Sequence, residues 1–170
     1  MPGKIIFLNG ASSSGKSTLA KLLHARLKEP YVLLSVDTFI ESMIFPEGIT
    51  DDVWTEIWPP LFHVAGFHAA ILAMWKYGLN MIIDHVLQEN NWFEELRELV
   101  EHEKTVFVGI YCNLEELEKR EKSRNDREIG IAKYQHERVH ENKSYTVTVD
   151  TSKSNPQECV DKIISTIESQ

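Results

Sequence analysis

Glycine, serine and lysine residues near the N-terminus form a pattern that could bind a polyphosphate. Residues 10–17 read Gly-Ala-Ser-Ser-Ser-Gly-Lys-Ser and match the G-x-x-x-x-G-K-[ST] phosphate loop. The glycines let the backbone curl so that several N–H groups point inward, and the N-terminus of a following helix adds partial positive charge. Lys16 can then reach the β- and γ-phosphates, and the Ser17 hydroxyl can bind Mg²⁺. We therefore expect ATP and Mg²⁺ as cofactors. The residues expected to hold the nucleotide here are Gly10, Ala11, Ser12, Ser13, Ser14, Gly15, Lys16, Ser17 and Thr18.

Two aspartates follow apolar segments that read as strands. Asp37 comes after residues 31–36, where its carboxylate could accept a proton from a substrate hydroxyl, although it could also be the N-cap of a short helix. Asp84 follows an apolar strand and resembles a Walker B acid, which holds Mg²⁺ directly or through water. The alternative for Asp84 is a solvated carboxylate at a strand end. His85 could contact substrate, but a lone histidine is more often packed or hydrogen-bonded.

Arginines interrupt a charged helical segment in the second half of the chain. Arg120, Arg124 and Arg127 lie in a helix–break–helix pattern, which predicts a lid over residues 120–136. Arginines in a mobile lid can close over phosphates and exclude water. The neighbouring acids indicate that the helix also has an ordinary solvated face; these are Glu115, Glu116, Glu118 and Glu121.

Residues 136–140 read His-Glu-Arg-Val-His and match the H-E-x-x-H zinc motif. A zinc protease would need a third ligand and would leave the phosphate loop without a role. A strand is predicted five residues later, and no convincing third ligand follows. We therefore interpret this match as accidental.

The elements that must position these residues alternate between strand and helix. Strands are predicted over residues 4–9, 31–36, 79–84, 105–112 and 145–149. Helices are predicted over residues 17–28, 61–77, 91–100, 114–123, 129–136 and 156–167, with a short one beyond Asp37. This alternation predicts an α/β fold with a five-stranded parallel sheet, in which ligands bind at the carboxyl ends of the strands.

A segment broken by proline and glycine follows the short helix. We expect residues 42–60 to form a substrate cap, because such a segment cannot be a central strand. Trp54 and Trp58 are then candidate substrate contacts, together with Phe39 and His85.

Length and charge limit the possible functions. The 170 residues suit one domain spanning residues 1–170, with 42% hydrophobic and 26% charged residues. A net charge of −8 argues against broad binding to nucleic acid or to anionic membranes. Cys112 and Cys159 have no metal-ligand spacing and read as core residues. With no signal peptide or membrane-spanning stretch predicted, we expect a cytoplasmic protein.

The chain resembles the chloramphenicol phosphotransferase family of P-loop kinases. The segments that carry the resemblance are residues 6–17, 36–41, 82–86, 108–112, 120–121, 124–127, 130 and 145–151. It implies a three-layer P-loop NTPase fold similar to shikimate and nucleoside monophosphate kinases, with a lid and a substrate cap. It also implies transfer of the γ-phosphate of ATP to a hydroxyl of a small molecule, which is an antibiotic in the namesake.

The resemblance also implies roles for individual residues. Asp37 would be the general base, and Lys16 and Ser17 would anchor the phosphates and Mg²⁺. The lid arginines Arg124 and Arg127 would act in catalysis, with Arg120 and Arg124 holding the nucleotide. Asp150 and Thr151 match the region near the adenine.

Two departures from the family pattern fall where substrate should bind. The third strand often ends in two acids in the family, whereas Asp84 is followed here by His85, and the tryptophan-rich cap differs from the family's flap. Chloramphenicol itself is therefore not implied as the acceptor. A nucleoside or nucleotide kinase and a regulatory NTPase without a small acceptor remain alternatives. The oligomeric state stays open.

Overall fold

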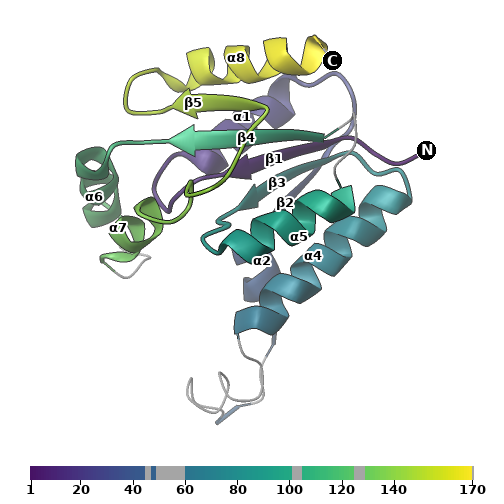
Figure 1. The fold of residues 1–170 in the computed structure, drawn as a ribbon, viewed down its shortest axis with the longest axis horizontal. Coiled ribbons are helices and arrows are strands. Elements are labelled where there is room, and N and C mark those ends of the chain that lie inside the picture. Colours follow the sequence, from purple (N-terminus) through teal and green to yellow (C-terminus); the bar gives the residue numbers. More distant parts are fainter. Residues whose placement is uncertain (45–46, 49–59, 101–104, 125–128, 170) are drawn as a thin grey trace.

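The fold is built on a sheet of five parallel strands. A computed structural model of the chain describes residues 1–44, 47–48, 60–100, 105–124 and 129–169 (Figure 1). The strands lie side by side in the order β2-β3-β1-β4-β5. Their bounds are β1 Ile5–Asn9, β2 Val32–Ser35, β3 Met81–His85, β4 Thr105–Tyr111 and β5 Val147–Asp150.

Helices cover both faces of this sheet. α1 (Lys16–Arg26) and α8 (Pro156–Glu168) lie on one face, and α4 (Pro60–Lys76) and α5 (Asn90–Val100) on the other (Figure 1). α2 (Val36–Glu41) packs against α4. α6 (Leu114–Lys122) and α7 (Ile131–His136) lie beyond the carboxyl end of β4. The predicted three-layer α/β fold with a five-stranded parallel sheet is confirmed.

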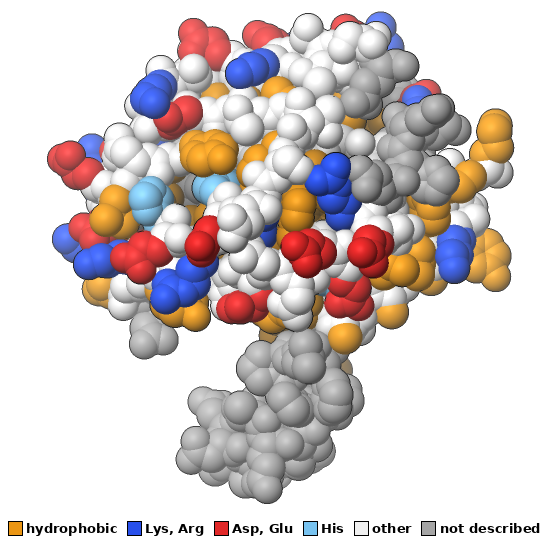
Figure 2. Space-filling view, viewed as in Figure 1, with side chains coloured by type: hydrophobic (Ala, Val, Ile, Leu, Met, Phe, Trp, Pro, Cys, Tyr) orange, Lys and Arg blue, Asp and Glu red, His pale blue; other side chains and the backbone are white. Residues whose placement is uncertain are grey.

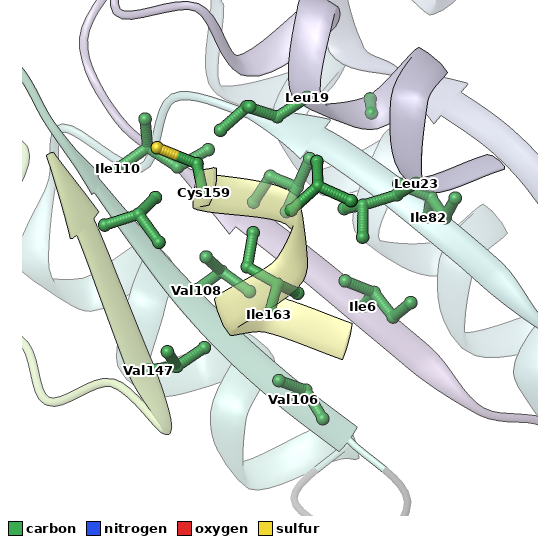
Figure 3. Packing of buried hydrophobic residues seen from close by; sticks show 14 of the residues in the cluster. Ile6, Leu19, Leu23, Ile82, Val106, Val108, Ile110, Val147, Cys159 and Ile163 are labelled. Carbon is green, nitrogen blue, oxygen red and sulfur yellow. The ribbon is translucent and has the colours of Figure 1, made fainter. Parts of the chain in front are cut away.

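The two faces of the sheet explain why the strands are apolar throughout. Every residue of β1 and β3 is buried, as expected for central parallel strands covered on both sides. Alternate residues enter two cores, so that Ile6 and Ile82 face α1 and α8, whereas Phe7 and Ile83 face α4 and α5. Figure 3 shows the first core, with Ile163 of α8 placed over Val108 of β4. Cys159 belongs to this core and Cys112 is also buried, so both predictions are confirmed.

The segment after β2 differs from the prediction. The strand ends at Ser35 and α2 begins at Val36, so Asp37 lies inside the first turn and Ser35 occupies the N-cap position. The interpretation of Asp37 as the N-cap was therefore wrong. The reason is that β2 lies at the sheet edge and is shorter than its apolar run. Of the predicted cap, Trp54 and Trp58 lie outside the described residues.

The strand register brings the predicted site together. Asp84 of β3 is paired with Leu8 of β1 and with Ser35 of β2. The phosphate loop, the start of α2 and the end of β3 therefore meet at one edge of the sheet. Figure 2 shows acidic and basic side chains interspersed on the face that it presents. None of the helices within the described ranges has the length and apolar character needed to cross a bilayer.

Candidate active site

The loop between β1 and α1 has the geometry of a phosphate cradle. Gly15 adopts φ 92°, a left-handed conformation that glycine accepts without strain, and α1 begins at the next residue. The loop hydroxyls of Ser12, Ser13 and Ser14 are buried, and no hydrogen-bond partner reaches them from the described residues. Unpaired buried hydroxyls call for a ligand, because burying them alone is costly. A polyphosphate fits this loop.

Lys16, Ser17 and Asp84 form a connected group at the start of α1. The Ser17 hydroxyl donates a hydrogen bond of 2.7 Å to Oδ2 of Asp84. Nζ of Lys16 lies 3.9 Å from Oδ1 of the same carboxylate and donates to the carbonyl of Ala11 at 2.9 Å. The alternative of a solvated Asp84 is wrong, because the residue is 8% exposed. A hydroxyl beside a carboxylate is an oxygen donor set that fits Mg²⁺.

A cleft of about 560 Å³ joins this group to α2. Its lining includes Lys16, Ser17, Asp37 and Asp84, so the predicted base and the predicted phosphate anchors share one space. Ser12, Ser13, Gly15 and Thr18 also line it. Asp37 is half-buried in the cleft. It follows Ser35 by two residues, and Ser35 of β2 is paired in register with Asp84 of β3. A hydroxyl bound in the cleft can therefore meet both a carboxylate and a phosphate chain.

Two of the three arginines of the predicted lid line the cleft. Arg120 lines the cleft and donates hydrogen bonds to the carbonyls of Ser13 and Thr151, so it joins α6 to the phosphate loop. Arg124 also lines the cleft. Arg127 lies outside the described residues, so its predicted role stays a prediction.

Comparison with known proteins identifies the relatives of this chain. Residues 3–168 match the family model described as "Chloramphenicol phosphotransferase-like protein". The chain belongs to the chloramphenicol phosphotransferase-like family. Two relatives from strains of Mycobacterium tuberculosis, both named "Putative O-phosphotransferase", are 28% identical over 170 residues, covering 88% of this chain and 76% of each relative. The protein is thus a phosphotransferase, an enzyme that transfers phosphate to a hydroxyl group.

Solved structures with the same fold include kinases. A sugar kinase from Janibacter sp. HTCC2649 superposes with a TM-score of 0.73 at 17% identity, covering 98% of this chain and 95% of that one. The Mycobacterium tuberculosis APS kinase, solved with AMPPNP and APS, has a TM-score of 0.68 at 15% identity and covers 98% of each chain. At these identities the likeness shows the fold of the phosphotransferase.

Asp150 and Thr151 separate in the structure. Thr151 lines the cleft, and its hydroxyl donates to the carbonyl of Ser14 at 2.7 Å. Asp150 does not line the cleft; instead it accepts hydrogen bonds from the backbone N–H and hydroxyl of Ser152. Burial tends to raise the pKa of Asp150, but the hydrogen bonds from Ser152 and Lys153 outweigh this effect, so the pKa is lowered. Asp150 thus stabilises the turn after β5, and its predicted place near the adenine stays a prediction.

The H-E-x-x-H match is not on one helix, because α7 ends at His136. His140 Nε2 donates to the Ile110 carbonyl at 3.2 Å, so its Nδ1 accepts from the Tyr145 hydroxyl at 2.8 Å. Burial lowers the pKa of His140 to about 4. With both nitrogens engaged by protein groups, His140 is a structural residue, in agreement with the interpretation of the motif as accidental.

Tyr145 and Asn9 extend this network to the phosphate loop. Asn9 precedes the loop and donates to the Tyr145 hydroxyl at 2.8 Å and to the Val139 carbonyl at 2.9 Å. Its side-chain carbonyl accepts from the Leu87 N–H at 2.8 Å. The network therefore ties the base of the loop to the segment after β3 and to the segment after α7.

His85 lies on the opposite side of β3 from Asp84. Its ring packs against Phe67 of α4 with 5.4 Å between ring centroids, and its Nε2 lies 3.2 Å from Nε2 of His68. Burial lowers the pKa of His68 to about 4. Burial also lowers the pKa of His85, and the nearby His68 and Lys16 side chains lower it further. His85 and Phe39 do not line the cleft, so their predicted contact with substrate stays a prediction.

Three residues near the site were missed from the sequence. Gln135 accepts a hydrogen bond from the Ser12 N–H at 2.7 Å, which brings α7 onto the phosphate loop. Glu121 is buried and accepts from the N–H groups of Gly130 and Ala132, both at 2.8 Å, so the prediction of a solvated face was wrong for this residue. His68 is 2% exposed. For Glu121 the sequence does offer a signal, because a glycine and the start of a predicted helix follow it within eleven residues. That pattern could have suggested its contact with the N-terminus of α7.

Proposed function

We propose that this phosphotransferase is a kinase that moves the γ-phosphate of ATP to a hydroxyl of a small molecule, as in the chloramphenicol phosphotransferases. The observation that carries the proposal is the shared cleft, in which Asp37 faces the same space as Lys16, Ser17 and Asp84. A carboxylate opposite a phosphate anchor is the arrangement needed for transfer to an alcohol. The family relationship supports the same chemistry.

Each side chain has a task in this proposal. The loop N–H groups and Lys16 hold the β- and γ-phosphates, while Arg120 and Arg124 neutralise charge on them from the lid side. Ser17 and Asp84 hold Mg²⁺, which when bound draws negative charge from the phosphate oxygens. Asp37 orients the acceptor hydroxyl and takes its proton while the oxygen bonds to the γ-phosphorus and the bridging P–O bond to ADP breaks.

The acceptor distinguishes this proposal from its alternatives. A nucleoside or nucleotide kinase would use the same residues with another alcohol. A regulatory NTPase without an acceptor would need no carboxylate in the position of Asp37, so the lining of the cleft favours a kinase.

The test is product analysis. Purified protein is incubated with Mg²⁺ and ATP, alone and with chloramphenicol, tunicamycin, D-gluconate, APS or uridine, and ADP release and product mass are measured. We expect one acceptor class to stimulate ADP release and to gain one phosphate. ATP binding with ADP release that no alcohol stimulates would favour the regulatory NTPase instead.

A further inference from the structure

A second polar cluster lies on the other face of β3, outside the described cleft. His85 at the end of β3 and His68 in the middle of α4 are each 2% exposed, and their Nε2 atoms are 3.2 Å apart. Their surroundings are aromatic, with Phe7 and Phe67 packed against the His85 ring. Two imidazoles in an apolar environment have few possible arrangements of protons.

The hydrogen bonds define that arrangement. The backbone N–H of Val86 donates to His85 Nδ1 at 2.8 Å, so this nitrogen carries no proton. Neutral His85 is then protonated at Nε2 and donates to His68 Nε2. His68 must in turn carry its proton on Nδ1. Both rings are therefore neutral.

The proton on Nδ1 of His68, the last in this series of hydrogen bonds, has no acceptor among the described residues. Nδ1 of His68 is buried, and no hydrogen-bond partner reaches it from the described residues. A buried donor without a partner is costly and uncommon in native proteins, so it calls for an explanation. A ligand that supplies an oxygen atom would satisfy it.

The position of His68 indicates which ligand that is. Its neighbour Phe67 packs on Phe39 with 5.3 Å between ring centroids, and Phe39 lies on α2 two residues after Asp37. His85 is paired in register with Asn9, the residue before the phosphate loop. The two histidines thus lie beside elements that contribute to the cleft, since α4 contacts α2 through Phe67 and Phe39 and His85 lies next to Asn9.

We propose that His68, aligned by His85, donates its Nδ1–H to an uncharged oxygen of the acceptor, a hydroxyl or an amide carbonyl. This proposal rests on the proposed kinase function. An uncharged oxygen is favoured because both imidazoles are held neutral by their hydrogen bonds and supply no charge to balance a buried carboxylate. Since Nδ1 is buried in the free protein, binding requires the residues around His68 to move.

The first arm of the test is independent of activity. Two-bond ¹H–¹⁵N spectra of ¹⁵N-histidine-labelled protein at pH 7 report the tautomer of each ring. We expect His85 protonated at Nε2 and His68 at Nδ1, with the His68 signal shifting when chloramphenicol is added with a non-hydrolysable ATP analogue. A His68 ring protonated at Nε2, or a signal that does not respond, overturns the proposal.

The second arm compares two replacements of His68 in the full chain. His68→Gln keeps an oxygen where His85 donates but removes the Nδ1–H, whereas His68→Asn keeps a donor near Nδ1. We expect the KM for chloramphenicol to rise about tenfold in the glutamine variant, the equivalent of one neutral hydrogen bond, and to stay near wild type in the asparagine variant. The KM for ATP should not change in either. His24→Gln on the exposed surface of α1 is the matched control.

The outcomes separate the two proposals. An equal chloramphenicol KM in wild type and His68→Gln overturns the role of His68 and leaves the kinase intact. A raised KM for ATP in His68→Gln also overturns it, because that indicates general damage to packing. Wild-type protein that phosphorylates D-gluconate but no uncharged alcohol overturns the assignment of an uncharged oxygen. Wild-type protein that phosphorylates no probe counts against the kinase function itself, and so against both.

Discussion

The Ser17 hydroxyl donates a hydrogen bond of 2.7 Å to Asp84, although 67 positions separate the two residues along the chain. The bond exists because β3 lies beside β1, so that the end of one strand meets the loop after the other. It joins the serine of the phosphate loop to the acid of the third strand. These are the two protein oxygens proposed to hold Mg²⁺.

Asp84→Asn tests this pair. The amide oxygen can still accept from Ser17, so we expect the fold and Tm to stay close to wild type. Losing the negative charge should raise the Mg²⁺ concentration for half-maximal activity roughly 10–100-fold. Activity measured over a Mg²⁺ titration checks this, with Asp161→Asn on the exposed face of α8 as the control. An unchanged titration would remove Asp84 from the metal site.

Asp37→Asn tests the proposed general base. The variant should bind ATP normally but transfer phosphate about 10²–10⁴-fold more slowly, because the amide cannot accept the hydroxyl proton. Glu41→Gln, at the exposed end of the same helix, should behave as wild type. Single-turnover kinetics with bound ATP separate binding from transfer. A wild-type transfer rate would leave Asp37 with only a structural role.

Glu121 of α6 joins that helix to the start of α7, and the two helices form the predicted lid. Glu121→Ala removes the acceptor of the buried Ala132 N–H and of the partly buried Gly130 N–H, and should cost about 1–3 kcal/mol of stability while raising the KM for ATP. Glu121→Gln keeps one acceptor oxygen, so its stability and its KM for ATP should lie between those of wild type and Glu121→Ala. Denaturant unfolding and ATP kinetics are the measurements, and Glu115→Ala at an exposed position is the control. Similar behaviour of the Glu115 and Glu121 variants would contradict this role.

The pKa of His140 gives the stability a pH dependence with a defined sign. Folding lowers this pKa from 6.5 to about 4, so between these values the unfolded chain binds a proton that the folded protein does not. Stability is therefore fully present above pH 6.5 and falls as the pH drops toward 4. At pH 5 the loss from this group is at most about 2 kcal/mol.

His140→Asn is the variant that isolates this effect. Its side-chain carbonyl can still accept from Tyr145, but it does not titrate. The free energy of unfolding, measured from pH 4.5 to 8, should fall less steeply with acid than in wild type. Equal pH profiles would show that His140 is not held neutral by the fold.

Local patterns explain which parts could be predicted from the sequence. The phosphate loop is one continuous segment between a strand and a helix, so residues 10–18 could be identified directly. The alternation of elements predicted the parallel sheet, and the sheet brings Asp37 and Asp84 to one edge. Element ends were less predictable, because the length of β2 depends on its neighbour as well as on its own apolar residues.

Contacts between distant segments explain what could not be predicted. Gln135 reaches the Ser12 N–H across 123 positions, and the His68–His85 pair depends on how α4 lies across β3. Glu121 looks like one more acid of a charged helix until α7 folds over it. No local pattern specifies a partner on another element. Of these residues, Gln135 contacts the phosphate loop directly.

The most direct test of the central claim is transfer of label from [γ-³²P]ATP to an added alcohol, with wild-type protein and Lys16→Ala compared side by side. The account predicts a labelled, phosphorylated alcohol with wild type. Lys16→Ala should lose this product because the anchor of the β- and γ-phosphates is gone. Wild-type-like transfer by Lys16→Ala, or label released from wild type only as inorganic phosphate, would contradict it.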